Sequence, residues 1–179
     1  MTDRTAASYD GTLERTADGG VIRFERHLAH PVREVWDAIT NPARLGEWWL
    51  PFDAEITVDL REGGQMVFAG TSEEEPVTMT FTILRVEPPM LLEHTHADPG
   101  SLVRWELEAV DGGCVLRISH AVTDADAAIE GCYVVGLHTS LERLEPCLAG
   151  RLVPWDWDAF AEAQVHYAAE GLAPEVGAS

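Results

Sequence analysis

The amino-acid sequence predicts an α+β fold in which a curved antiparallel sheet closes over two short helices and a long C-terminal helix. Three observations lead to this prediction. Apolar residues alternate with a period of two between residues 54 and 122, which is typical of strands that bury one face. Turns rich in glycine and proline separate the alternating runs. Before and after this region, the apolar spacing changes to three or four residues, which indicates amphipathic helices.

The chain has the length and composition of a single domain. Its 179 residues are 46% hydrophobic, which is enough to bury a core without metals or disulfides. No repeat, long linker or low-complexity segment divides the sequence. The periodic region predicts a domain over residues 21–150, followed by a helical extension at 151–170. The polar ends, residues 1–20 and 171–179, are expected to be flexible.

Two short helices are predicted after a first strand at residues 21–29. Pro31 suits the first turn of a helix, and apolar residues then recur every three or four positions. Asn41 and Pro42 should end this helix, and a second one is expected from Pro42 to about Trp48. This helix pair is expected to cover the open end of the sheet.

Six further strands are predicted after the helix pair. Their ranges are residues 54–60, 65–70, 77–86, 90–96, 102–110 and 114–122. The segments between them contain Gly-Gly, Pro-Pro or Asp-Pro-Gly, which suit turns that need positive or fixed φ. Because each connection is short, the simplest topology is a meander of hairpins.

A long packing helix is predicted from about residue 124 to about residue 150, with Thr123 or Asp124 as its N-cap. Its apolar stripe consists of Tyr133, Leu137, Leu141, Leu144 and Leu148. Pro146 lacks a backbone donor and should bend or end the last turn. Gly131 and Gly136 each cost up to about 1 kcal/mol relative to alanine inside a helix. Close approach of a ligand, or simple close packing, would offset that cost.

Composition excludes several classes of function. The formal net charge is -19, from 31 acidic and 12 basic residues, and no basic stripe exists that could bind nucleic acid. The acidity is expected to keep a solvated surface soluble. No run of about 18 apolar residues predicts a membrane span, and the N-terminus lacks the pattern of a signal peptide. Three cysteines without CxxC spacing argue against a disulfide framework or a zinc knuckle, so we expect a cytoplasmic protein.

Several motifs are specific in their spacing. They are residues 30–42 (HPVREVWDAITNP), 63–68 (GGQMVF), 86–89 (VEPP) and 136–144 (GLHTSLERL). These segments resemble the START-like superfamily, also called SRPBCC or Bet v-like, in the branch of the heat-shock chaperone ATPase activator homologues. The resemblance covers about residues 21–150 and implies a helix-grip fold. One departure is Leu137, where many relatives carry tryptophan before the histidine of the last helix.

The resemblance implies a cavity between the sheet and the long helix, because the superfamily includes lipid carriers, hormone receptors and polyketide cyclases. The implied ligand is a small apolar or amphipathic molecule. The eukaryotic namesakes stimulate a chaperone ATPase but carry a separate N-terminal domain for that work, and we do not expect such a domain within the residues before Val21. Homodimers are common among relatives, so a second copy of the chain is one further partner that the resemblance implies. A chaperone is another. Fold alone does not decide function.

The candidate site is the concave face of the sheet beneath the long helix. Strand alternation places three histidines on that face, where they could fix a polar group of a mostly apolar ligand. The aromatic residues divide between core packing and cavity lining. The candidate ligand-binding residues are Trp36, Trp48, Phe68, Phe81, His94, His96, Trp105, His120, Tyr133, Leu137 and Leu141. Trp155 and Trp157 are expected to anchor the last helix instead.

Three functions stay open at this stage. The first is a binding module that encloses its ligand without turning it over, and the second is a chaperone cofactor. The third is a cyclase, dehydratase or hydrolase that uses the inward histidines as general acid and base. The three imidazoles would also suit an open zinc site. The alternative is that the histidines bind no metal and form hydrogen bonds to each other, to the backbone or to water. We predict no cofactor and assign no catalytic residue, because nucleophile elbows and phosphate loops are absent from the sequence.

Overall fold

The computed structural model describes residues 9–177, which contain one antiparallel sheet of eight strands in the order β1-β2-β8-β7-β6-β5-β4-β3. The strands are β1 (Thr12–Thr16), β2 (Gly19–Leu28), β3 (Ala54–Val58), β4 (Gln65–Ser72), β5 (Glu75–Glu87), β6 (Leu91–Thr95), β7 (Leu102–Val110) and β8 (Gly113–Val122). The helices are α1 (Val32–Thr40), α2 (Pro42–Trp48), α3 (Ala125–Glu130), α4 (Tyr133–Leu148) and α5 (Trp157–Ala169). The predicted α+β helix-grip fold is confirmed.

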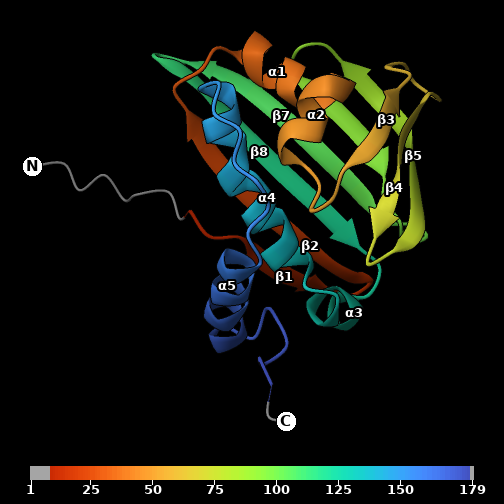
Figure 1. The fold of residues 1–179 in the computed structure, drawn as a ribbon, viewed down its shortest axis with the longest axis vertical. Helices are drawn as coiled ribbons and strands as arrows, with labels where there is room; N and C mark the ends of the chain where they lie inside the picture. Colours follow the sequence, from red (N-terminus) through yellow and green to blue (C-terminus); the bar gives the residue numbers. More distant parts are fainter. Residues whose placement is uncertain (1–8, 178–179) are drawn as a thin grey trace, which may run out of the picture.

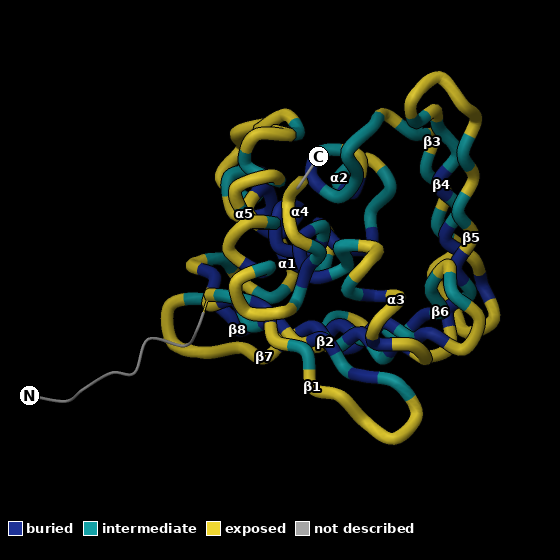
Figure 2. The backbone as a smooth tube through the Cα atoms, turned by 90° about the horizontal axis from the view of Figure 1, so that it is seen from below, coloured by how far each residue is buried: buried dark blue, intermediate teal, exposed yellow. Residues whose placement is uncertain are grey.

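The sheet curves around α4. Figure 1 shows α4 crossing the face of the sheet, with α1 and α2 at one end of it and α3 and α5 at the other. Seen from below, the strands bend from β1 and β2 round to β3, and the buried segments gather on the inner side (Figure 2). The core therefore lies between the concave face and the helices, where Trp48, Leu116 and Leu141 are almost fully enclosed.

The strand register places a row of side chains across this concave face. His94 on β6 lies opposite Val103 on β7, Val103 lies opposite His120 on β8, and His120 lies opposite Ile22 on β2. Directly paired residues have Cβ atoms about 4.5–5.5 Å apart, so successive members of the row are neighbours. Two of the predicted inward histidines thus share one row, separated by a valine.

The two short helices begin and end close to their predicted positions. Pro42 occupies the first turn of α2, and the Asn41 side chain accepts a hydrogen bond from the Ala43 amide at 3.1 Å. An asparagine N-cap followed by proline is a strong signal for a helix start. The sequence therefore determines this boundary locally.

The chain ends differ from the sequence prediction. Residues 9–20 were expected to be flexible, but they contain β1, and the Ala173 side chain in the predicted C-terminal tail is buried. β1 forms by backbone pairing with β2, and the chain just before it is held by the Tyr167 hydroxyl on α5, which accepts a hydrogen bond from the Gly11 amide at 2.8 Å and lies 2.9 Å from His138 Nδ1. The C-terminal segment begins with a backbone hydrogen bond from the Leu172 amide to the Tyr167 carbonyl, so both terminal segments bond to Tyr167. Residues 1–8 and 178–179 lie outside the described residues.

The predicted single long helix is wrong, because it is broken into α3 and α4. Cys132 adopts the left-handed conformation (φ 55°), which no helix interior accommodates. Asp124 does act as an N-cap, but of α3, where its carboxylate accepts from the Ala127 amide. Gly131 is explained by close packing, since a Cβ there would lie 2.8 Å from the Tyr133 ring. Pro146 is tolerated inside α4, which ends two residues later.

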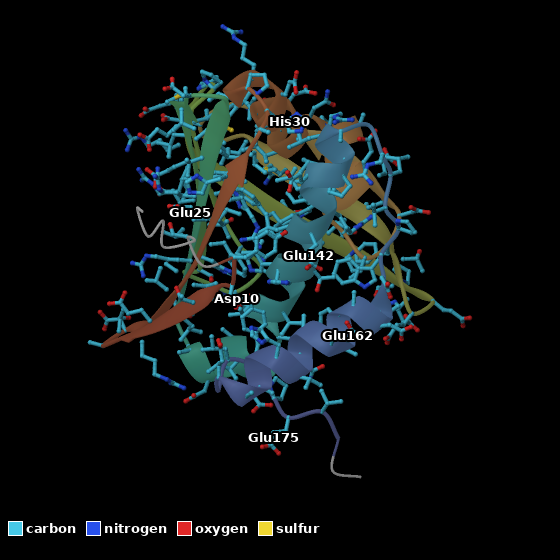
Figure 3. The ribbon with its side chains drawn as sticks, turned by 90° about the vertical axis from the view of Figure 1, so that its left-hand side faces the viewer. Asp10, Glu25, His30, Glu142, Glu162 and Glu175 are labelled. Atoms are coloured by element: carbon cyan, nitrogen blue, oxygen red, sulfur yellow. The ribbon has the colours of Figure 1, made fainter. Side chains whose placement is uncertain are left out.

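The acidic residues are distributed over the surface. Figure 3 labels Glu25 on β2, Glu142 on α4 and Glu162 on α5, whose carboxylates lie at separate places on the molecule. This distribution agrees with a solvated surface rather than a single acidic patch. Within residues 9–177, no helix is both long and apolar enough to cross a membrane.

Candidate functional site

A cavity of about 300 Å³ lies between the concave face of the sheet and α4. Its lining comprises Trp49, Leu50, Pro51, Met79, Phe81, His96, Val103, His120, Gly131, Cys132, Tyr133, Gly136, Leu137, Ser140, Trp155, Trp157 and Phe160. The cavity reaches the surface at Trp157, which is 61% exposed. Its volume is at the lower limit of known ligand pockets, which are predominantly apolar with a few polar groups.

The structure divides the predicted site residues into three groups. Phe81, His96, His120, Tyr133 and Leu137 line the cavity. Phe68, His94 and Trp105 face a void of only about 10 Å³, which is room for no more than a water molecule. Trp36, Trp48 and Leu141 line neither space and pack in or against the core.

Sequence reasoning missed much of the cavity wall. The segment Trp49, Leu50 and Pro51 follows α2, and Trp155 and Trp157 precede or begin α5. Trp155 and Trp157 were expected to anchor the last helix instead of lining the cavity, and this prediction is wrong in its second part, because both border the cavity. Trp155, Trp157 and Phe160 contact one another, with ring centroids 5.5–6.1 Å apart. No periodic pattern marks these loop positions, although the density of aromatic residues was a usable signal.

His94 is held in a fixed hydrogen-bonded state. Its Nε2 accepts a hydrogen bond from Trp105 Nε1 at 3.0 Å, so its proton is on Nδ1, which donates to the Thr95 carbonyl at 2.7 Å. Burial lowers the pKa of His94 to about 4, because the charged imidazolium would lose its hydration. With both nitrogens in use, His94 has a structural role.

His120 is held in one tautomer by its neighbour Ser101. The Ser101 hydroxyl donates its hydrogen to the Ala121 carbonyl at 2.9 Å, so towards His120 Nε2, 3.0 Å away, it can only accept. His120 therefore carries its proton on Nε2 and presents Nδ1 as an acceptor. Burial first, then the neighbouring imidazole of His96, lowers the pKa of His120 to about 3.

His96 and Tyr133 complete one wall of the cavity. The His96 ring lies with its centroid 4.5 Å from that of His120 and 5.3 Å from that of Phe81, while the Tyr133 ring stacks on His120. The Tyr133 hydroxyl donates to the Asp98 carboxylate, and burial raises the pKa of Tyr133 to about 12. His96 Nδ1 is enclosed by protein and has no hydrogen-bond partner among residues 9–177. Burial also lowers the pKa of His96.

These hydrogen bonds restrict the chemistry of the histidines. A zinc site of His94, His96 and His120 is not formed, because both nitrogens of His94 already have partners. In the described part of the chain, the group of side chains close enough to hold a metal is Asp10, His166 and Glu170, which is near the surface and outside the cavity. Imidazoles with a pKa of about 3 or 4 are also poorly matched to acid–base catalysis near neutral pH.

Arg143 on α4 connects the segments that form the cavity wall. Its guanidinium donates to the backbone carbonyls of Glu47 and Trp48 at the end of α2, of Leu50 after α2, and of Val153 before α5, at 2.8–3.3 Å. The side chain is buried, and desolvation lowers its pKa. A cation at the C-terminal end of a helix satisfies carbonyls that have no partner within the helix. Arg143 thereby fixes the position of Trp49, Leu50 and Pro51.

The buried histidines predict a loss of stability in mild acid. An unfolded histidine has a pKa of about 6.5, whereas His94 and His120 have folded values of about 4 and 3, so the unfolded chain binds more protons below pH 6.5. We expect the free energy of unfolding to be constant above this pH and to fall by about 1 kcal/mol per pH unit for each imidazole below it.

Urea unfolding between pH 7.5 and 5.0 measures this dependence above the range in which most carboxylates titrate. The variant His120→Gln should show a shallower decline, whereas His27→Gln, at an exposed position on β2, should keep the wild-type slope. A wild-type stability that does not change between pH 7 and 5 would contradict the assignment of neutral, desolvated imidazoles.

Comparisons with known proteins agree with this architecture. Residues 29–149 match the family described as "Activator of Hsp90 ATPase homolog 1-like protein". Protein CalU16 from Micromonospora echinospora is 28% identical, with a TM-score of 0.68 over 89% of this chain and 96% of that chain. Protein EF2215 from Enterococcus faecalis, a conserved protein of unknown function, is 20% identical, with a TM-score of 0.70 over 89% of each chain.

A third solved structure, protein NE0264 from Nitrosomonas europaea, is 23% identical, with a TM-score of 0.65 over 75% of this chain and 97% of that chain. No curated protein matches the sequence. At identities below 25%, likeness to solved structures shows the fold alone, whereas the family match spans most of the predicted domain. The chain therefore belongs to the activator of Hsp90 ATPase homolog 1-like family, a branch of the START-like superfamily.

Proposed function

We propose that this protein binds a small apolar or amphipathic molecule in the cavity between the sheet and α4, without chemically changing it. The cavity supports this proposal by its position and its lining, which is mostly apolar, includes six Trp, Tyr and Phe rings and has few polar groups. Aromatic rings bury a large area per side chain and favour flat apolar ligands.

The observation that carries the proposal is Gly136. A Cβ built at this position meets no atom within 4 Å, although Gly136 lies inside α4, three residues after its first residue Tyr133, and lines the cavity. Glycine here costs α4 about 0.5–1 kcal/mol relative to alanine, and no packed neighbour of the residue offsets that cost. The absence of a side chain keeps this part of the cavity open, which is what an enclosed ligand requires.

The state of the histidines favours binding over catalysis. His94 and His120 stay neutral near pH 7 and are weak proton acceptors. Of the two, only His120 lines the cavity, where it can orient a polar group. The cavity also presents no nucleophile with an adjacent base: the Ser140 hydroxyl donates to the Trp49 carbonyl, and burial raises the pKa of Cys132. These features are those of a site that holds a molecule.

Titration with N-phenyl-1-naphthylamine, a neutral fluorescent probe, tests the proposal. We expect saturable fluorescence enhancement with one site per chain, together with quenching of tryptophan emission, because Trp49, Trp155 and Trp157 line the cavity. Probe at 100 times its dissociation constant should raise the free energy of unfolding by about 2.7 kcal/mol. The absence of saturation and of any stabilisation by a panel of neutral apolar molecules would refute the proposal.

The family description supports a second candidate, a chaperone cofactor. An ATPase assay with the chaperone of the host distinguishes the two functions. Stimulation that persists when the cavity is filled by mutation would favour the cofactor role, whereas unchanged turnover and no association would exclude it.

A further inference from the structure

The histidine wall of the cavity presents one acceptor and one donor side by side. His120 Nδ1 is an acceptor, because the hydrogen bonds of Ser101 place the proton of His120 on Nε2. It has no hydrogen-bond partner among the described residues. Among residues 9–177, His120 Nδ1 is not one of the fully buried side-chain nitrogens that have no partner. The atom is therefore accessible, and we place it at the cavity that His120 lines.

The neighbouring His96 supplies the donor. Its Nδ1 is enclosed without a partner, whereas its Nε2 is open and equally without a partner in the described chain. A neutral imidazole carries one proton. If that proton were on Nδ1 of His96, a buried N–H would have no acceptor, so the proton is placed on Nε2, at the cavity. The two rings are neighbours, with centroids 4.5 Å apart, and both line the cavity.

The rest of the lining is unsuited to an ionised ligand. Of the described residues around the cavity, none is a lysine or an arginine that could pair with an anion, and none is an aspartate or a glutamate that could pair with a cation. The guanidinium of nearby Arg143 is directed at four backbone carbonyls. A carboxylate or phosphate enclosed there would lose its hydration without gaining a counter-ion, which disfavours its binding.

A hydroxyl group matches the histidine pair. It is neutral at pH 7, and it donates one hydrogen bond and accepts another through the same oxygen. On the basis of the proposed binding function, we infer that the ligand is a neutral aromatic molecule with a hydroxyl group that donates to His120 Nδ1 and accepts from His96 Nε2. The aromatic body would lie among Phe81, Tyr133 and the tryptophans at the opposite wall.

A matched series of three compounds tests this inference: 2-naphthol, naphthalene and 2-naphthoate. They share one ring system and differ only in the group presented to the histidines. Isothermal titration calorimetry at pH 7.5 should give an affinity for 2-naphthol about tenfold above that for naphthalene, the difference expected for a satisfied hydrogen-bonding group. Binding of 2-naphthoate should be weaker than that of naphthalene.

Two variants attribute the preference to the histidines. In His96→Phe and in His120→Phe, the ratio of the 2-naphthol affinity to the naphthalene affinity should fall to about one. His27→Phe, the same substitution at an exposed site, should keep the wild-type ratio. Replacement of the buried His120 can prevent folding. His96 is only half-buried, so His96→Phe should still fold and can test the inference alone.

The outcomes separate this inference from the proposed function. Equal affinity for 2-naphthol and naphthalene, or tightest binding of 2-naphthoate, would overturn the hydroxyl inference and leave the binding function standing. A tenfold preference that persists in His96→Phe and His120→Phe would also overturn it. Failure of all three compounds, together with N-phenyl-1-naphthylamine, to bind would overturn both.

Discussion

Replacement of Gly136 by leucine is expected to abolish binding of N-phenyl-1-naphthylamine while the fold is kept. The position lines the cavity, and a Cβ there meets no atom within 4 Å, so a larger side chain enters the free volume instead of the packed core. Leucine is a far better helix former than glycine, so α4 gains stability from the change. The measurement is the fluorescence titration, with circular dichroism and urea unfolding as checks on the fold.

Gly136→Ala is the matched control for this variant. It removes the same backbone flexibility but adds one methyl group, so the free energy of unfolding should rise by about 0.5–1 kcal/mol while the probe still binds. If Gly136→Leu bound the probe as well as the wild type does, the binding site would have to lie elsewhere. A destabilised Gly136→Leu would show that the apparent space is not available to a side chain.

Arg143→Met is expected to lower the free energy of unfolding by about 3–5 kcal/mol. The methionine side chain fills similar space but cannot donate hydrogen bonds, so the carbonyls of Trp48 and Leu50 lose the partner that Arg143 provides at 2.9 and 2.8 Å. Each buried acceptor left unpaired costs about 1–3 kcal/mol. Guanidinium unfolding at pH 7.5 measures the loss.

Arg117→Met provides the comparison. Arg117 also makes several contacts, but with the Glu25 and Glu108 carboxylates at the surface, where its side chain is 45% exposed. Ion pairs of this kind contribute at most about 1 kcal/mol. Arg143→Lys should recover only part of the wild-type stability, because an ammonium cannot reach carbonyls in the fork geometry of a guanidinium. Equal stabilities for Arg143→Met and Arg117→Met would contradict the assigned role.

Much of the fold could be predicted because its signals are local. Asn41 and Pro42 determine a helix start by their own side chains, and the alternating strands show their buried face in the sequence. β1 was missed because only Leu13 in it is half-buried, so backbone pairing with β2 carries the strand and no alternation appears. The break before α4 was missed because Cys132 adopts a conformation that usually needs glycine or asparagine.

The candidate site was predictable only in part, for a similar reason. His96 and His120 could be assigned to the cavity because their strands have a regular period. His94 follows the same pattern, but it is held outside the cavity by a hydrogen bond from Trp105 on the neighbouring strand. The sequence of one strand does not reveal such a contact between strands. Trp49 and Trp155 come from loops far apart in sequence, which Arg143 brings together through backbone carbonyls. Such contacts produce no periodic pattern in the sequence, so they could not be predicted from it.

The order of strands also has a consequence for the route by which the chain folds. From β3 to β8 every strand pairs with its neighbour in sequence, whereas β2 and β8 pair residues as distant as Ile22 and His120. The chain between β2 and β8 must lose conformational entropy before the contacts between these two strands can form. This makes the pairing of β2 with β8 the slow step of folding. Any chain in which the β1–β2 hairpin is undocked exposes an unpaired edge of β8, and such edges recruit strands from other molecules. Docking of the N-terminal hairpin thus protects the protein against aggregation.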